Sequence, residues 1–138
     1  NFSKLSHFIF FLKQESKKNK IKISLEINEN FNVFKKLLSI KKINDIKITF
    51  DTGNFYIKNK NVIKSLKSYY PFVNHIHLKD RSISGKNVVF GSGKIDFAGL
   101  FKFLKERKYS KFFTFETNRG NVAQETAANN LKIVKKFI

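Results

Sequence analysis

The sequence predicts an α/β fold with parallel strands, arranged as part of a (β/α)₈ barrel. A short β-branched or aromatic run, then a loop, then apolar residues at helical spacing recur four times along the 138 residues. Alternating strands and helices imply parallel strands joined by helical crossovers. Within each strand, apolar residues alternate with small or polar ones, whereas the strands of a doubly wound sheet are apolar on both faces. The alternation favours a barrel, with an outer face under helices and an inner face that rises to a polar mouth.

The individual elements follow from residue spacing and from local capping residues. Apolar residues three or four apart predict helices over 2–16, 33–38, 62–69, 97–104 and 123–137, with Asn61 and Asp96 as N-caps. Runs of β-branched and aromatic residues predict strands over 21–26, 46–51, 73–78 and 112–116. Thr52 and Gly53 are expected to close the second strand. An antiparallel sheet with one solvated face would also alternate, but it would not account for the intervening helices.

The polar face of the predicted strands carries the candidate site. Side chains alternate between the two faces of a strand, which places Val73 and His75 on the same face as His77. Each strand ends near one ionisable side chain on this face: Glu26, Asp51, His77 and Glu116. Barrel active sites are built at the carboxyl ends of the strands. Three converging carboxylates repel one another unless a cation is present. We therefore expect one divalent ion here, and the mixed oxygen and nitrogen ligands suit Mn²⁺, Mg²⁺, Co²⁺ or Zn²⁺. Glu26 and Glu116 could then exchange protons with a substrate.

Composition limits the classes of partner. The formal net charge is +18, but lysines carry nearly all of it and are spread over the whole chain. Together with the abundance of Asn, Ile and Phe, this indicates AT-rich codon usage, so nucleic acid is not the expected partner. No run approaches the roughly 18 apolar residues of a membrane span and no signal peptide is recognisable, so a cytoplasmic enzyme without a membrane partner is expected. The chain begins at Asn1 and contains no cysteine, which indicates a missing N-terminus and excludes thiolate ligands.

Five segments resemble, in chain order, the motifs of the xylose isomerase-like TIM barrels, a superfamily of sugar phosphate isomerases and epimerases that includes the AP-endonuclease family 2 type. They are ISLEINEN, ITFDTGNFY, VNHIHLKDR, FGSGKIDFAGLFKFLKERKY and FFTFET. The resemblance implies a single divalent metal held by Glu26, Asp51, His77 and Glu116. It also implies that Glu26 and Glu116 take and return the proton at the stereocentre.

The same resemblance implies roles for residues around these ligands. His75 and Lys79 match the motif around the metal-binding His, and Asn54 stands where the family often has a substrate-binding His. We expect Asn54, His75 and Lys79 to bind substrate, with inner-layer packing as the alternative for His75. Asp80 is expected to orient its loop through backbone hydrogen bonds. Asn32 replaces a glutamate of the ketose epimerases, and together with Asn54 it counts against ketose 3-epimerase activity.

The resemblance assigns the four strands as strands five to eight. Residues 1–138 are then the C-terminal half of a barrel domain, which is expected to be inactive alone, and a half-barrel that forms a homo-oligomer is the alternative. The expected function is that of a metal-dependent isomerase or epimerase in carbohydrate metabolism. It would act on a sugar, sugar phosphate or related polyol by proton transfer next to a carbonyl. The alternatives are an AP-endonuclease-like phosphodiesterase on DNA and a non-catalytic truncated barrel. The endonuclease branch needs further His and Asp ligands, and Asn54 replaces one such His.

Overall fold

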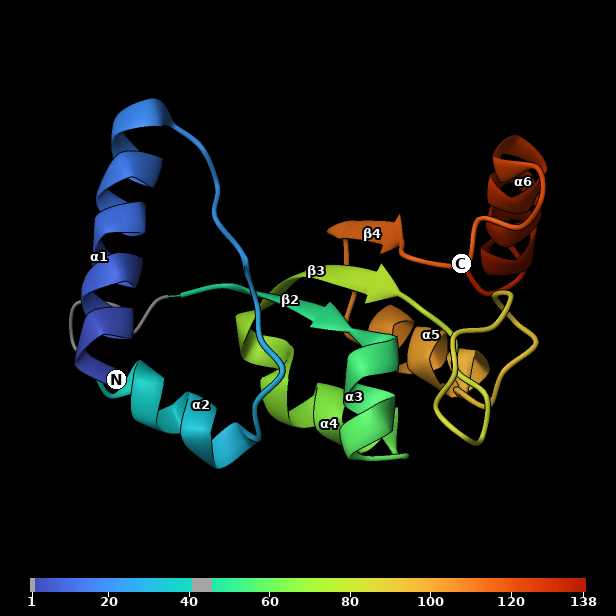
Figure 1. Ribbon diagram of the computed structural model, residues 1–138, viewed down its shortest axis with the longest axis horizontal. Helices are drawn as coiled ribbons and strands as arrows, with labels where there is room; N and C mark the ends of the chain where they lie inside the picture. Colours follow the sequence, from blue (N-terminus) through green and yellow to red (C-terminus); the bar gives the residue numbers. More distant parts are fainter. Residues whose placement is uncertain (1, 41–45) are drawn as a thin grey trace.

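The computed structural model describes residues 2–40 and 46–138. It contains a parallel sheet in the order β1-β2-β3-β4, so each strand lies beside the next one in the sequence. The strands are β1 (Leu25–Glu26), β2 (Ile48–Asp51), β3 (Val73–Leu78) and β4 (Phe112–Phe115). The helices are α1 (Phe2–Asn19), α2 (Phe31–Leu38), α3 (Thr52–Lys58), α4 (Val62–Tyr69), η1 (Tyr70–Phe72), α5 (Phe97–Glu106) and α6 (Ala123–Val134). This confirms the predicted partial barrel of parallel strands (Figure 1).

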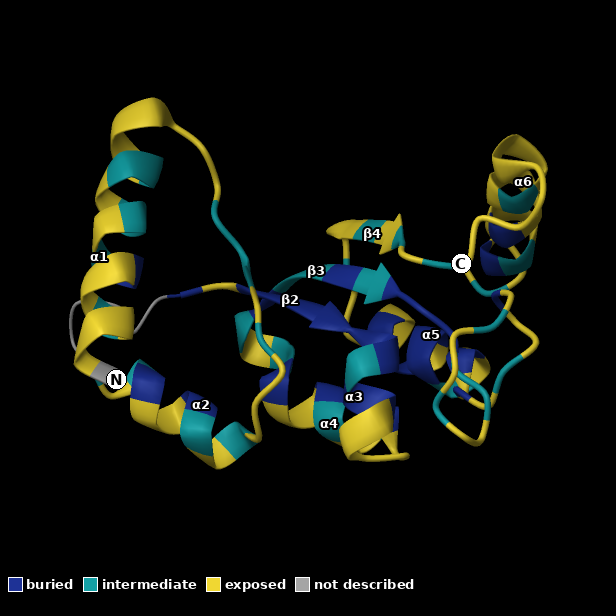
Figure 2. Cartoon of the chain, viewed as in Figure 1, coloured by how far each residue is buried: buried dark blue, intermediate teal, exposed yellow. Residues whose placement is uncertain are grey.

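One face of the sheet forms the hydrophobic core. Helices α3, α4 and α5 lie along this face, where the strands and the helix surfaces that meet them are buried (Figure 2). Ile48, Phe50, Ile76 and Leu78 are all fully buried, as the alternation within β2 and β3 predicts. Aromatic rings fill the space under the strands, including Phe50, which stacks on Phe55 with ring centroids 4.2 Å apart. Burial of this face supplies most of the driving force for folding.

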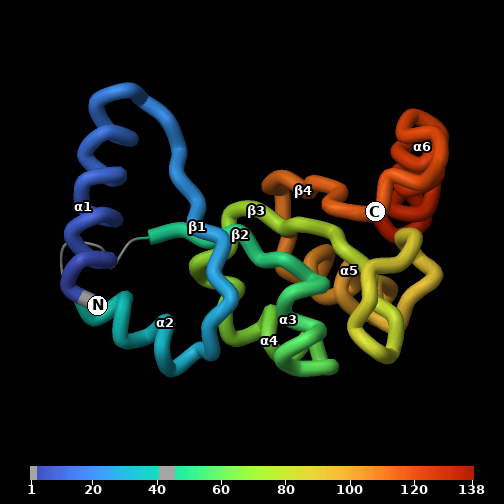
Figure 3. Tube along the Cα trace, viewed as in Figure 1, coloured from blue at the N-terminus to red at the C-terminus, as the bar shows by residue number. Residues whose placement is uncertain are grey.

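The opposite face of the sheet is open in the described part of the chain. Phe112 on β4 is 75% exposed, and a hollow lined by Ser24, Asn74 and His75 lies beside it. Helices α1 and α6 lie on opposite sides of the sheet, α1 next to β1 and α6 after β4 (Figure 3). The edge strands β1 and β4 each pair with a single neighbour among the described residues, so one edge of each has no partner strand there.

The first strand is shorter than predicted. Only Leu25 and Glu26 of residues 21–26 form ladder pairs, with Ile48 and Thr49 of β2. Ile21 is 62% exposed. A strand forms only where a neighbour accepts its hydrogen bonds, and β1 pairs only with the short strand β2. The other three strands match their predicted positions closely, and β3 has the predicted bounds.

The prediction that Val73 lies on the polar face is wrong. Val73 is 1% exposed and belongs to the hydrophobic core. The register between β2 and β3 pairs Ile48 with Val73 but Thr49 with His75, so Asn74 is an extra residue. A bulge of this kind reverses the side-chain alternation on one side of it.

Thr52 and Gly53 begin the helix α3, whereas the sequence predicts that they only close the second strand. Asp51 caps this helix by accepting a hydrogen bond from the Asn54 amide. Gly53 lowers helix propensity, but a Cβ at this position would lie 2.7 Å from Lys79 Cγ. Glycine at this position therefore allows the Lys79 side chain to pass close to the backbone of α3. Among the described residues, no helix combines the length and apolar character that a membrane span requires.

The aromatic cluster under the sheet provides a test of the fold. Phe34 is 2% exposed, and its ring centroid lies 5.5 Å from that of Tyr69 and 5.2 Å from that of Phe72. We expect Phe34→Ala to lower the free energy of unfolding by about 3–5 kcal/mol, because it removes a buried ring and leaves a cavity. Phe8→Ala is the matched control, since Phe8 is 58% exposed and should change the value by less than about 0.5 kcal/mol. Urea titration followed by circular dichroism measures both values, and equal losses would contradict the packing described.

Candidate metal centre

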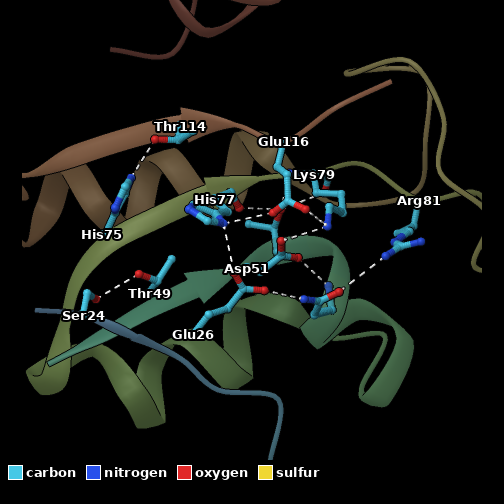
Figure 4. Close-up of polar contacts among 12 residues, drawn as sticks. Ser24, Glu26, Thr49, Asp51, His75, His77, Lys79, Arg81, Thr114 and Glu116 are labelled. Atoms are coloured by element: carbon cyan, nitrogen blue, oxygen red, sulfur yellow. Dashed lines mark hydrogen bonds and ion pairs between the residues drawn. The ribbon is translucent and has the colours of Figure 1, made fainter. Parts of the chain in front are cut away.

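The four predicted ligands meet at one end of the sheet. One ligand atom from each of Glu26, Asp51, His77 and Glu116 lies within 4.8 Å of those of the others. Glu26 and Asp51 are the last residues of β1 and β2, His77 is the penultimate residue of β3, and Glu116 directly follows β4 (Figure 4). Parallel pairing brings the carboxyl ends of neighbouring strands to the same edge, which explains why residues up to 90 positions apart in the sequence converge. The spacing of these oxygen and nitrogen atoms suits a divalent ion.

The two glutamates approach the histidine from opposite edges of the sheet. Glu26 Oε2 lies 3.3 Å from His77 Nδ1, and Glu116 Oε2 lies 3.0 Å from the same atom. The Glu116 amide also donates a hydrogen bond to the carbonyl oxygen of Leu78, which continues the β3–β4 pairing beyond the last ladder residue. The imidazole therefore lies between two carboxylates that are both partly exposed on the open face.

Asp51 is fully buried, and its two carboxylate oxygens have different surroundings. Oδ1 accepts the hydrogen bond from the Asn54 amide at 2.6 Å and caps α3. Oδ2 has no hydrogen-bond partner, although Lys79 Nζ lies 3.3 Å from it. Burial raises the pKa of Asp51, and the Asn54 hydrogen bond and the charge of Lys79 only partly oppose this. Oδ2 makes an ion pair with Lys79 but no hydrogen bond. A carboxylate oxygen can accept more than one such contact, so Oδ2 fits the role of a metal ligand.

Lys79 brings a positive charge into the cluster. Its Nζ donates to Glu116 Oε1 at 2.6 Å as well as lying near Asp51 Oδ2. Burial alone would lower the pKa of Lys79, but the hydrogen bond to Glu116 and the charge of Asp51 outweigh it and raise the pKa. Partial burial alone would raise the pKa of Glu116. The hydrogen bond from Lys79 opposes this effect, and the net result is a lowered pKa. The ammonium and the Glu116 carboxylate thus favour each other's charged form.

The predicted substrate-binding residues occupy three different positions. Asn54 Nδ2 donates to Glu26 Oε1 at 2.9 Å, so its side chain borders the cluster. Lys79 lies within the cluster. His75 does not join it: His75 Nε2 lies 2.7 Å from Thr114 Oγ1 and the ring packs edge-on against His77. Burial and the neighbouring His77 lower the pKa of His75, which suits a neutral imidazole further inside the barrel. Substrate binding by these three residues stays a prediction.

Two residues near the cluster were not predicted. The Thr52 hydroxyl donates to the Lys79 carbonyl at 2.7 Å and accepts from the Lys79 amide at 2.9 Å, which fixes the backbone after His77. Arg81 Nη1 donates to the Gly85 carbonyl, and Nη2 lies 3.4 Å from Asn54 Oδ1. Arg81 could have been identified from the sequence as a basic residue that directly follows the Lys79-Asp80 pair. The role of Thr52 depends on contacts between two strand ends, which the sequence does not reveal.

Asp80 holds the loop after β3, as predicted. Its carboxylate accepts hydrogen bonds from the backbone amides of Arg81, Gly91 and Gly93 at 2.8–2.9 Å. Asp80 is 1% exposed, so these bonds form in a protected environment. This carboxylate folds residues 81–93 back toward β3, which places Arg81 beside the four candidate ligands.

Sequence comparison finds a matching family model and several related proteins. A family model described as the xylose isomerase-like TIM barrel matches residues 9–137. Inosose dehydratase from Clostridium botulinum (strain Eklund 17B / Type B) is 28% identical, over 61% of this chain and 34% of that protein. Inosose dehydratase from Serratia proteamaculans (strain 568) is 31% identical, over 54% of this chain and 32% of that protein.

Solved structures have the same fold. A xylose isomerase domain protein from Planctomyces limnophilus superposes with a TM-score of 0.82 at 19% identity, covering 98% of this chain and 53% of that one. D-allulose 3-epimerase from Methylomonas sp. superposes with a TM-score of 0.80 at 17% identity, covering 100% of this chain and 56% of that one. The chain therefore spans about a third of the curated relatives and about half of these structures.

The dual role of Asp51 as helix cap and candidate ligand can be separated by two substitutions. Asp51→Asn keeps a side-chain oxygen that can accept from the Asn54 amide, whereas Asp51→Ala removes it. We expect the Ala variant to be less stable than the Asn variant by about 1 kcal/mol, because only Ala loses the cap of α3. Both variants should bind Mn²⁺ much more weakly than the unsubstituted chain. Urea titration and Mn²⁺ binding measure the two effects, and equal stability of the variants would contradict the capping role.

Proposed function

The chain belongs to the xylose isomerase-like TIM barrel family, and on that premise we propose that it carries the metal centre of an enzyme that acts on a sugar, a sugar phosphate or a related polyol. The proposed reaction is the removal and return of a proton at a carbon next to a carbonyl. Isomerisation or epimerisation is the expected outcome of such a transfer.

One observation supports this proposal above all others. Glu26 and Glu116 come from the two outer strands of the sheet and approach His77 Nδ1 from different sides, at 3.3 and 3.0 Å. Two carboxylates that face one site from different directions can remove a proton on one side of a carbon and deliver one on the other. This is the requirement for inversion of a stereocentre. We propose Glu26 and Glu116 as the two proton-transfer residues.

We propose that Glu26, Asp51, His77 and Glu116 also hold one divalent ion. The buried Asp51 Oδ2 without a hydrogen-bond partner and the convergence of the four side chains support this assignment. Mn²⁺, Mg²⁺, Co²⁺ and Zn²⁺ all accept such a ligand set. When bound, the ion would polarise a carbonyl or hydroxyl oxygen of the substrate and so make the neighbouring carbon more acidic.

Asn54, His75 and Lys79 are proposed to bind the substrate. Asn54 borders the cluster, and its amide lies between Glu26 Oε1 and Arg81 Nη2. An amide can donate to and accept from sugar hydroxyls but cannot take a proton at neutral pH. Asn54 would therefore orient the substrate and leave the proton transfer to the glutamates.

A dehydratase reaction is the second candidate, and the curated relatives favour it. The relatives matched in sequence are named inosose dehydratases, whereas the matched structures include an epimerase. Loss of water from a hydroxy ketone and inversion of a carbon beside a ketone share the removal of a proton next to the carbonyl. The same pair of glutamates could serve either reaction, with the leaving hydroxyl protonated in the first case.

Deuterium exchange tests the shared step. We expect protein that contains this chain, loaded with Mn²⁺ and incubated in D₂O with an inosose or a ketose, to place deuterium on the carbon next to the carbonyl. Glu116→Gln should reduce this exchange by about 10²–10⁴-fold, since the amide cannot accept the proton. Glu106→Gln removes the same charge from an exposed position on α5 and should exchange normally.

The products distinguish the alternatives. NMR detects an epimer with deuterium at the inverted carbon, whereas an unsaturated ketone that absorbs in the ultraviolet would indicate dehydration. Exchange that persists in Glu116→Gln would rule out its catalytic role. Nicking of abasic DNA by the same preparation would instead favour a phosphodiesterase.

We propose that residues 1–138 form the C-terminal half of a closed barrel and do not turn over substrate alone. The open inner face and the coverage of about half of the solved structures support this. Phe112 would then be covered by the other strands. We expect Phe112→Ala to change the unfolding free energy of this chain by less than about 0.5 kcal/mol, but to destabilise a protein with all eight strands by about 3 kcal/mol. Chemical denaturation measures both values, and an equal small change would contradict closure over Phe112.

A further inference from the structure

Lys79 places its ammonium group against two of the four candidate metal ligands. Nζ lies 2.6 Å from Glu116 Oε1 and 3.3 Å from Asp51 Oδ2. These contacts are sheltered, because the side chain of Lys79 is 10% exposed and that of Asp51 is fully buried. Asp51 Oδ2 has no hydrogen-bond partner of its own. Lys79 therefore supplies the positive charge that lies nearest to this buried oxygen among the described residues.

The fold holds Lys79 in this position at both ends of the residue. The Thr52 hydroxyl bonds to its backbone amide and carbonyl, which fixes the start of the side chain. The aliphatic stem passes directly over Gly53, where an added Cβ would lie 2.7 Å from Cγ and 2.8 Å from Cδ. The stem can take this path only because residue 53 has no side chain. The ammonium is thus directed toward the carboxylates by the packing.

The two oxygens that contact Lys79 differ in what a metal ion would require of them. Glu116 has a second oxygen, Oε2, which faces His77, so Glu116 could bind an ion and keep its bond to Lys79. Asp51 has no such choice, because its Oδ1 is already bonded to the Asn54 amide at 2.6 Å. A divalent ion at this centre would have to bind Asp51 Oδ2 in place of the Lys79 ammonium. The Lys79 ammonium and a divalent cation that both contact this oxygen would repel each other strongly in a partly buried site.

We propose that Lys79 is the counter-cation of the metal-free centre and competes with the metal ion for Asp51 Oδ2. Lys79 neutralises part of the charge of the converging carboxylates while no ion is bound. When an ion binds, the ammonium group loses its contact with Asp51. The consequence is a weaker and more readily exchanged metal ion than the ligand set alone would give. This inference rests on the proposed metal centre, and it concerns a positioning residue rather than a proton-transfer group.

Replacing the lysine with an uncharged residue of similar length tests the competition. Lys79→Met keeps an apolar stem over Gly53 but removes the ammonium. We expect its dissociation constant for Mn²⁺ to fall by about tenfold or more relative to the unsubstituted chain, because a nearby positive charge is lost. We also expect the unfolding temperature of the metal-free protein to fall, since Asp51 and Glu116 lose their counter-cation. The increase in that temperature on adding Mn²⁺ should therefore be larger than in the unsubstituted chain.

The measurement is titration of the full chain with Mn²⁺, followed by the electron paramagnetic resonance signal of the free ion, together with calorimetric unfolding. Lys102→Met is the matched control, because it removes the same charge from an exposed position on α5 and should leave Mn²⁺ affinity unchanged. Gly53→Ala is an independent variant that retains the lysine. Its new methyl group displaces the Lys79 stem, so it should also tighten Mn²⁺ binding.

The possible results separate this inference from the proposed function. If Lys79→Met binds Mn²⁺ as the unsubstituted chain does, or more weakly, Lys79 does not compete and the inference is wrong, although the metal centre stands. If neither the unsubstituted chain nor any Lys79 or Gly53 variant retains Mn²⁺, the metal centre itself is wrong and the inference fails with it. Tighter binding in Lys79→Met that disappears in Lys79→Met/His77→Ala would locate the effect at the proposed centre.

Discussion

The buried carboxylate of Asp51 joins the fold of this chain to its candidate metal centre. One oxygen caps α3 through the Asn54 amide and so determines how the chain leaves β2. The other oxygen points to the place where Glu26, His77 and Glu116 meet. Both orientations follow from its position at the last residue of a fully buried strand. Since a carboxylate is buried only at a considerable cost unless it is paired, the surrounding residues must supply donors and positive charge. Asn54 and Lys79 do so, and each also contacts one of the glutamates. The rest of the cluster is organised around this one group.

The convergence of the four candidate ligands could be predicted because it depends on two regular properties of parallel strands. Side chains alternate with a period of two, and the carboxyl ends of neighbouring strands lie together. Those rules fail where a local irregularity intervenes. The bulge at Asn74 moves Val73 into the core, and nothing in the run of residues 73–78 signals an extra residue. The helix α3 was missed for a related reason, because Gly53 is compatible with a turn until the stem of Lys79 is seen to pass over it.

The open face of the sheet sets a second constraint, which concerns stability more than chemistry. Phe112 is exposed on this face while the opposite face is filled with buried rings. A single sheet with one covered face can fold when its other face is polar, and Glu26, His75 and Thr114 make part of it so. Phe112 does not fit that pattern. In the closed barrel proposed above, this ring would pack in an inner layer against the side chains of further strands.

The supports of the candidate ligands all come from within this chain. Asn54 holds Glu26 and Asp51, Lys79 holds Glu116, and Thr52 holds the backbone after His77. Groups that orient metal ligands tune the affinity of a site for its ion, and these described residues would orient the ligands of the proposed centre. Substrate selection differs, because in barrels it depends on loops from every strand, and the described part of the chain contains four strands and the loops that follow them. The proposed metal binding and the choice of substrate would therefore be separable in this fold. For that reason, tests of the metal centre are informative on this chain alone, whereas tests of specificity require the rest of a barrel.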